Sequence, residues 1–377
     1  MPPLSEMRFR ASPHIELKQL SELTAEQREP LRDLESDPDC YGLFVPRPPL
    51  MMNLKSVGRQ TAELFRTLVT PSRLDDESAR GAIDLVLDGI LEVESGEDFV
   101  SGADALALLS ALPAPSDVSN STARLSHNAL LYAQDLETRD PRKLASSLYI
   151  YNRIPISPFW KTRFASREAI LAYLGADRGP LRALLEREWV LSLNVTAWLF
   201  WSSRAKRRPR EDEVTYKLYV SPRPERIRDA FEIAARVLSD FPEAQFKIGD
   251  SVVGLLRPDK FVAYFATYEQ LLEAAGELRR ELAGCEAHGV PFTAGLDDSG
   301  LLSWGIDPPD NDRALRWLRR ESWRLWVANC LGAAISIAKL SHSASAVEPW
   351  RFAIERARRH GVDVETWTPS ATLWSAA

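Results

Sequence analysis

The chain has 377 residues and a formal net charge of −6; 45% of its residues are hydrophobic and 27% are charged. These values are ordinary for a soluble globular protein, and the length allows a large core or two domains. The negative net charge argues against a general nucleic-acid-binding protein, so any site for an anion is expected to be local.

The cysteines and histidines give no sign of a metal site or of disulfide bonds. Cys40, Cys285 and Cys330 lie far apart, and no two of the five histidines have a metal-ligand spacing. The N-terminus lacks the apolar core of a signal peptide, and the apolar run 189–201 is interrupted by polar residues and too short to span a bilayer. We therefore expect a cytoplasmic protein with no cofactor, no membrane partner and no nucleic-acid partner.

The first 110 or so residues are expected to be mainly helical, because "ELTAEQREPLRDLES" and "NLKSVGRQTAELFRTLVT" place apolar residues at helical spacing. The segment "ILEVESGEDFVSG" alternates apolar and polar residues around a glycine, which indicates a small hairpin. After a loop at 110–123, further helices are predicted in "LSHNALLYAQDLETRDPRKLASSLYIYNRIP", "ASREAILAYLG" and "GPLRALLERE".

The composition changes near residue 210. The segment "RAKRRPREDE" (204–213) is basic and then acidic, which is typical of a solvated linker and is also compatible with a positive lip on a cleft. The segments after it predict the order β-α-β-β-α-β, then a long helix and a terminal helix–strand unit. We therefore expect an α+β protein, with a mainly helical domain at 1–210 and an α+β domain with a mainly antiparallel sheet at 211–377.

Cations are concentrated in the second predicted domain. The stretch "FKIGDSVVGLLRPDKFVAYF" (246–265) reads as two strands joined by a turn, and it carries Lys247, Arg257 and Lys260 among apolar residues. Lys217 lies on the preceding predicted strand. A strand pair that serves only a core would not carry so many cations, so this region is expected to bind an anion.

Several short motifs together resemble a known family. "YKLYVS", "FKIG", "LLRPDKFVAYF", "GVPF", "GLLSWGIDPP" and "ESWRLWVANCLGAA" follow one another in the order and spacing of the HopA-like family. That family is known from type III effectors and includes lyase components of lanthipeptide and thioamitide biosynthesis, which are similar to phosphothreonine lyases. The resemblance implies β-elimination of phosphate from a precursor peptide that a partner kinase has phosphorylated, giving dehydroalanine or dehydrobutyrine.

The resemblance also implies roles for individual residues. Lys247 in "FKIG" matches the lysine that acts as base, a role that requires a lowered pKa from burial beside Phe246 and Ile248 and from nearby cations. Lys217 and Tyr219 in "YKLY" are two apart, so a strand places both on one face. The phosphothreonine lyases have histidine at the position of Tyr219, where it protonates the leaving group; whether tyrosine replaces it stays open.

The remaining predicted site residues would bind the phosphate. Arg257 and Lys260 flank the turn of "RPDK", and Tyr264 follows on the next strand. Arg324 falls where relatives place an arginine at the start of a helix. Asp307 in "GIDPP" is expected to cap a turn rather than to take part in chemistry.

Two other functions are compatible with the same residues. The chain could be a non-catalytic module that binds a phosphorylated or leader peptide and presents it to a kinase, because tyrosine at position 219 departs from the lyase pattern. An effector that acts in a host cell is the third alternative. The sequence alone does not separate the enzyme from the binding module.

Overall fold

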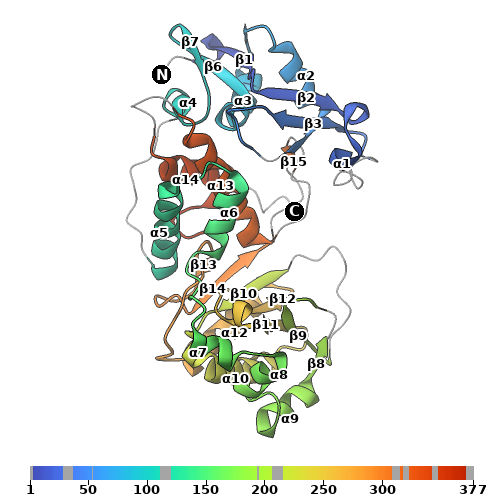
Figure 1. The fold of residues 1–377 in the computed structure, drawn as a ribbon, viewed down its shortest axis with the longest axis vertical. Coiled ribbons are helices and arrows are strands. Elements are labelled where there is room, and N and C mark those ends of the chain that lie inside the picture. Colours follow the sequence, from blue (N-terminus) through green and yellow to red (C-terminus); the bar gives the residue numbers. More distant parts are fainter. Residues whose placement is uncertain are drawn as a thin grey trace.

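The computed structural model describes residues 3–28, 37–52, 54–110, 120–192, 195–205, 215–307, 315–316, 322–341 and 347–370. It confirms the α+β fold with mainly antiparallel sheets. Along the longest axis, a β-rich N-terminal region is followed by a layer of helices and then by a large sheet with its own helices (Figure 1).

The N-terminal region is mixed rather than mainly helical. It contains two four-stranded antiparallel sheets, in the orders β5-β1-β6-β7 and β15-β4-β3-β2. The expected hairpin is present as the pair β6–β7. Short strands such as "RFRA" and "IELKQ" have too few residues to show a clear alternation of apolar and polar side chains. The helices beside them are long enough to show apolar residues at helical spacing. The elements are η1 (Leu4–Glu6), β1 (Arg8–Ala11), β2 (Ile15–Gln19), η2 (Leu20–Glu22), α1 (Ala25–Arg28), β3 (Cys40–Pro46), β4 (Lys55–Gly58), α2 (Arg59–Thr67), β5 (Ser72–Arg73), α3 (Asp76–Leu87), β6 (Leu91–Ser95), β7 (Asp98–Val100), α4 (Gly102–Leu109) and β15 (Leu315–Arg316).

The middle layer is built from helices of both halves of the sequence (Figure 1). Helix α13 (Trp323–Ala338) packs against α6 (Pro141–Ile150) and α14 (Pro349–Arg359), and α5 (Ser121–Asp135) packs against α6 and α14. The contact between α13 and α6 is close at Gly332, where a Cβ atom would lie 2.6 Å from the backbone nitrogen of Ala145. These helices share one hydrophobic core with the N-terminal sheets.

A seven-stranded sheet forms the other end of the described molecule, in the order β13-β14-β10-β12-β11-β9-β8, with every neighbouring pair antiparallel. Helices α10 and α12 cover one of its faces. The elements of this part are α7 (Pro158–Arg163), α8 (Arg167–Leu174), α9 (Gly179–Glu188), β8 (Trp189–Ser192), β9 (Trp198–Ser203), β10 (Tyr216–Val220), η4 (Pro224–Arg226), α10 (Ile227–Leu238), β11 (Gln245–Gly249), α11 (Val252–Leu255), β12 (Phe261–Phe265), α12 (Tyr268–Glu281), β13 (Ala294–Gly295) and β14 (Leu302–Ile306), and near the C-terminus β16 (Val362–Asp363) pairs with β17 (Thr368–Pro369).

A division of the chain at residue 210 would cut through this sheet. Strands β8 and β9 lie before that position, yet β9 pairs with β11, with Trp201 opposite Phe246. Trp201 stacks on Phe246 at a centroid distance of 5.1 Å, so these strands belong to the same core as β10–β14. The basic–acidic segment that suggested the boundary lies largely outside the described residues, at 206–214.

The period of two along each strand gives the seven-stranded sheet two different faces. The face toward α10 and α12 is apolar and includes Leu218, Phe246 and Phe261. The other face carries Lys217, Lys247 and Tyr264, and α13 approaches it at Gly305, where a Cβ atom would lie 2.7 Å from the ring of Trp323. Among the described residues, no helix is long and apolar enough to cross a membrane.

Candidate functional site

Strand register brings four predicted residues onto one face of the sheet. Lys217 of β10 lies opposite Tyr264 of β12. Val262, the next residue on this face of β12, lies opposite both Tyr219 of β10 and Lys247 of β11. Residues that are directly or diagonally opposite on one face are close enough for their side chains to interact. The two lysines and the two tyrosines therefore form one compact group.

Lys247 has surroundings suited to a base. Its Nζ atom lies 4.4 Å from the ring centroid of Trp198 and 5.4 Å from that of Tyr264. Burial and, after it, the charge of Lys217 lower the pKa of Lys247 to about 8. The burial comes from these rings and not from Phe246 and Ile248, as the sequence had suggested, because both of those side chains lie in the core on the opposite face.

Lys217 is held by a carboxylate. It is 8% exposed, and its Nζ atom donates a hydrogen bond to Oδ1 of Asp307. Asp307, which was expected to cap a turn, directly follows β14, the strand that pairs with β10. The ion pair fixes the Lys217 ammonium group on the same face as Lys247, where its charge disfavours protonation of Lys247.

Tyr219 is less suited to the role of acid than the sequence pattern suggested. Its side chain is 4% exposed and packs with Val262, Val290 and Tyr264. Burial raises the pKa of Tyr219 well above its ordinary value. A hydroxyl group with a raised pKa gives up its proton less readily, so an efficient transfer to a leaving group is disfavoured.

Arg257 forms a side-on pair with Asp259. Its Nε atom lies 2.8 Å from Oδ1 of Asp259 and its Nη2 atom lies 2.7 Å from Oδ2. Nη2 also donates to the hydroxyl oxygen of Tyr149, which belongs to α6, at 2.7 Å. Although burial opposes ionisation, Arg324 and Arg257 hold the pKa of Asp259 well below its usual value.

Arg324 is buried and contacts the carboxylate of this pair. It is 1% exposed, and its Nη1 atom lies 2.7 Å from Oδ2 of Asp259. Its Nε atom donates to the carbonyl oxygen of Pro291 at 3.1 Å, and its Nη2 atom donates to that of Tyr149 at 3.0 Å. Nε and Nη2 thus donate to backbone carbonyl oxygens, whereas Nη1 contacts Asp259 as an ion pair without a hydrogen bond. Arg324 therefore lies in direct contact with Asp259, and its predicted contact with a phosphate stays a prediction.

Lys260 is not brought into the group around Lys247. It is fully buried, and its Nζ atom lies 2.9 Å from the carbonyl oxygen of Pro222 and 2.7 Å from Nδ1 of His288. Nε2 of His288 in turn contacts the carbonyl oxygen of Asn152 at 2.5 Å. Burial lowers the pKa of Lys260 to about 7 and that of His288 to about 3. This chain of contacts joins the end of α6 to the sheet.

Sequence reasoning missed Tyr149, Trp198 and the central role of Asp259. The signal for Asp259 was present, because an aspartate two residues from an arginine in "RPDK" is a natural partner for that arginine. Tyr149 and Trp198 carried no such signal, since both occur in segments rich in aromatic residues. Within the described residues, no group of three or more histidines, cysteines, aspartates or glutamates could hold a metal ion.

The arrangement can bind an anion and remove a proton. The basic side chains of Lys217, Lys247, Arg257 and Arg324 outnumber the two carboxylates of Asp259 and Asp307, so the site has excess positive charge. A dianionic phosphate ester complements such a site. Burial and the charge of Lys217 lower the pKa of Lys247 to about 8, and it can therefore accept a proton near neutral pH.

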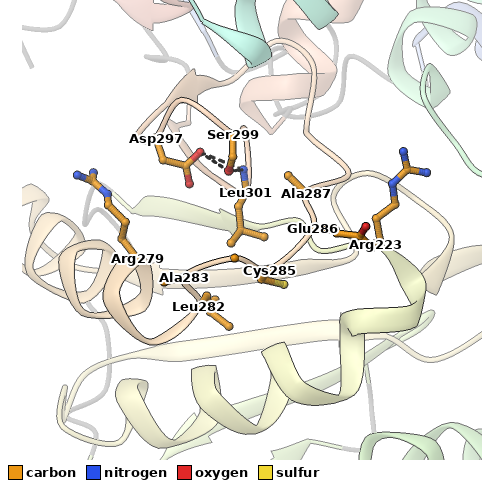
Figure 2. Close-up of a pocket in the computed structure, with 11 residues that line it drawn as sticks. Arg223, Arg279, Leu282, Ala283, Cys285, Glu286, Ala287, Asp297, Ser299 and Leu301 are labelled. Atoms are coloured by element: carbon orange, nitrogen blue, oxygen red, sulfur yellow. Dashed lines mark hydrogen bonds between the residues drawn. The ribbon is translucent and has the colours of Figure 1, made fainter.

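A surface hollow of about 570 Å³ lies elsewhere, beside the C-terminal end of α12 (Figure 2). Arg279 and Arg223 extend at its two ends, and Asp297 turns toward its own loop, where the carboxylate accepts hydrogen bonds from the backbone of Gly300 and Leu301. None of the predicted site residues lines it. The hollow is therefore separate from the group around Lys247.

Comparison with known proteins gives structural neighbours alone. No family model and no curated protein matches the chain. Among solved structures, the chain is similar to an effector protein from Pseudomonas syringae pv. tomato strain DC3000, with 13% identity, a TM-score of 0.39 and coverage of 68% of this chain and 99% of that one. It is also similar to an effector protein from Pseudomonas syringae pv. syringae strain 61, with 12% identity, a TM-score of 0.40 and coverage of 67% and 99%.

Proposed function

We propose that the protein is a phosphoserine/phosphothreonine lyase that eliminates phosphate from a phosphorylated precursor peptide. The products are dehydroalanine or dehydrobutyrine, as in the biosynthesis of lanthipeptides or thioamitides, and a partner kinase supplies the phosphorylated peptide. The observation that carries the proposal is Lys247, a partly buried lysine with its pKa lowered to about 8 on the same sheet face as Lys217 and Tyr264. A base and an anion site side by side are what the elimination requires.

The proposed reaction begins with neutral Lys247. Its Nζ atom takes the α-proton of the phosphorylated residue, and the electron pair of the Cα–H bond forms the Cα=Cβ double bond. Negative charge that develops on the peptide carbonyl oxygen is stabilised by the ammonium group of Lys217, which Asp307 holds in place. The Cβ–O bond breaks, its electron pair leaves with the phosphate, and the proton remains on Lys247.

The departing phosphate is held by Arg257. Without a proton donor, the dianionic ester leaves as a phosphate with three negative charges; the nearby cations offset the added charge, and the phosphate takes up a proton from water on release. This route agrees with the burial of Tyr219, whose hydroxyl group has a raised pKa. The reaction moves no electrons to or from an external carrier, so it requires no redox cofactor, and Lys217 and Arg257 supply the positive charge.

The second candidate function is a non-catalytic phosphopeptide-binding module. The observation that favours it is again Tyr219, because the phosphothreonine lyases have histidine at this position as the acid. Such a module would use the same excess of positive charge to bind a phosphopeptide for a partner kinase but would leave the Cβ–O bond intact.

Incubation with one synthetic peptide in three forms separates the two functions. The peptide would carry threonine, phosphothreonine or phosphoserine at one position, and mass spectrometry would follow loss of phosphoric acid. We expect the phosphorylated forms to lose it with time and the threonine form to stay intact. Tight binding of phosphorylated forms without any loss of mass would instead support the binding module, and equal weak binding of all three forms would exclude both.

A further inference from the structure

We propose that Asp259 is a positioning residue that holds Arg257 in the orientation that binds the phosphate. Arg324 offsets the negative charge of Asp259, so the positive charge of Arg257 stays available to the phosphate. This inference rests on the proposed function and assigns a role to a carboxylate that would not touch the substrate. It follows from how the three side chains share their hydrogen-bonding atoms, and from the residues around them.

Asp259 restrains one edge of the Arg257 guanidinium group. Its two carboxylate oxygens accept from Nε at 2.8 Å and from Nη2 at 2.7 Å, so the planar group is held side-on. Among the described residues, Nη1 of Arg257 has no hydrogen-bond partner, and the side chain retains 21% exposure. The remaining donors of Arg257 are therefore available to an anion from solvent.

A single arginine paired with a buried carboxylate would be neutral overall and would attract an anion weakly. Arg324 changes this balance, because its Nη1 atom also lies 2.7 Å from Oδ2 of Asp259. Arg324 is 1% exposed and directs its other nitrogens to backbone carbonyl oxygens. The two guanidinium groups and the one carboxylate together carry a net charge of +1. Arg257 is the more exposed of the two arginines, at 21% against 1% for Arg324, so an anion from solvent would meet this charge at Arg257.

Tyr149 completes the restraint from the helical layer. Its hydroxyl oxygen accepts from Nη2 of Arg257 at 2.7 Å. Its ring centroid lies 5.2 Å from the guanidinium carbon of Arg257 and 4.9 Å from that of Arg324. Arginine side chains lose considerable rotamer freedom on binding a ligand, so a guanidinium group that is already fixed binds phosphate with less entropic cost.

The inference is tested by a double-mutant cycle between Asp259→Asn and Arg257→Ala. Calorimetry would measure binding of the phosphothreonine peptide and of its unphosphorylated form. We expect Asp259→Asn alone to weaken binding of the phosphorylated form by about tenfold or more, and to have little effect on the unphosphorylated form. In the Arg257→Ala background, the same substitution should cause no further loss, because Asp259 acts through Arg257.

Asp88→Asn is a matched control. The side chain of Asp88 has the same 8% exposure as that of Asp259, and it is likewise shared between two cations, Lys55 and Arg356, outside the candidate site. We expect this control to lower stability without changing the preference for the phosphorylated peptide. If Asp259→Asn does not fold, Tyr149→Phe tests the same restraint, since it removes the hydroxyl contact to Arg257 and keeps the ring.

The outcomes separate the inference from the proposed function. Full additivity of Asp259→Asn and Arg257→Ala, or unchanged phosphopeptide binding by both Asp259→Asn and Tyr149→Phe, would overturn the positioning role while the proposed function stands. No preference of the unaltered protein for the phosphorylated peptide would overturn both. A loss confined to the phosphorylated peptide and absent in the Arg257→Ala background supports the positioning role.

Discussion

Asp259 and Asp88 are buried to the same degree and each is shared between two cations, yet their surroundings differ in charge. Asp88 belongs to the joint cluster, which we define as Lys55, Asp84, Asp88, Arg356 and Arg359. Asp259 belongs to the site cluster, which we define as Lys217, Lys247, Arg257, Asp259, Asp307 and Arg324. The joint cluster links β4, α3 and α14, and the site cluster lies where the seven-stranded sheet meets the helical layer.

The difference lies in which cations have carboxylate partners. In the joint cluster every cation contacts a carboxylate: Lys55 pairs with Asp88, Arg359 with Asp84, and Arg356 with both. In the site cluster, Lys247 forms no ion pair with any described residue and faces aromatic rings instead. A cluster in which every cation has a carboxylate partner stabilises a fold, whereas a buried lysine with a lowered pKa and no ion-pair partner is suited to binding and chemistry.

The largest difference between the two clusters should appear when a lysine is removed from each. We expect Lys247→Ala to lower the rate of elimination by at least the roughly 10²–10⁴-fold that one proton-transfer residue contributes, with the fold retained. Lys55→Ala should leave the rate of the folded protein nearly unchanged. Mass spectrometry of the phosphothreonine peptide measures both rates, and an unchanged rate in Lys247→Ala would remove this lysine from the mechanism.

The reverse contrast is expected for stability. Arg356→Met leaves Asp84 and Asp88 without their central buried partner, and loss of one member of a buried ion pair costs about 3–5 kcal/mol in the free energy of unfolding. Urea unfolding followed by tryptophan fluorescence measures this loss. The rate of elimination by the folded variant should stay close to that of the unaltered protein; a large fall in rate would mean that the two clusters are coupled.

Arg257 and Lys260, which the sequence grouped together, should behave differently. Arg257→Ala should weaken binding of the phosphorylated peptide by about 10- to 150-fold, the value of one charge-assisted hydrogen bond, with little change for the unphosphorylated form. Lys260→Ala should instead lower the free energy of unfolding by about 2–4 kcal/mol, because it leaves a cavity and two buried acceptors without a donor. Calorimetry and urea unfolding of both variants test this separation; a selective loss of phosphopeptide binding in Lys260→Ala would return Lys260 to the phosphate site.

The rate of elimination should depend on pH through Lys247. The neutral amine is the active form, and burial together with Lys217 sets the pKa near 8. The rate should therefore rise about tenfold per pH unit well below pH 8 and level off above it. Lys217→Met removes the neighbouring charge, so it should move the midpoint of the rate profile upward. A flat profile between pH 6 and about 9 would contradict the assignment of Lys247 as base.

Much of the site could be predicted because it depends on local periodicity. The alternation in "YKLY" and "FVAYF" places Lys217, Tyr219 and Tyr264 on one face once both segments are strands, and the antiparallel pair then brings the two strands together. Fold class was accessible for the same reason, since the strands and helices after residue 215 are marked by clear periods and by turn residues.

The rest of the site depends on contacts between distant segments. Asp259 meets Arg324, which lies on a helix packed against the sheet through Gly305 and Trp323, and no local pattern specifies that contact. The placement of β9 beside β11 is similarly non-local, so the boundary expected at residue 210 followed a change in composition and not the pairing of strands. Arg257 and Lys260 diverge because Arg257 lies in the turn and keeps 21% side-chain exposure, whereas Lys260 directly precedes β12 and is fully buried.

The smallest effect is expected at Tyr219, and it decides whether the site uses an acid at all. The hydroxyl group of Tyr219 is buried beside Val262 and Val290, and its raised pKa makes it a poor proton donor. If the phosphate leaves unprotonated and is held by Arg257, Tyr219→Phe should change the rate of elimination by less than about threefold, far below the roughly 10²–10⁴-fold that a general acid contributes. Tyr219→His introduces a side chain that can protonate in the accessible pH range, and any gain in rate should then appear below the pKa of that histidine.

The rates of both variants should be measured with a phosphothreonine peptide across that pH range, with urea unfolding as a check on the packing around position 219. A fall of 10²-fold or more in Tyr219→Phe, with unchanged stability, would establish Tyr219 as the acid and would show that burial does not prevent its hydroxyl group from reaching the leaving phosphate.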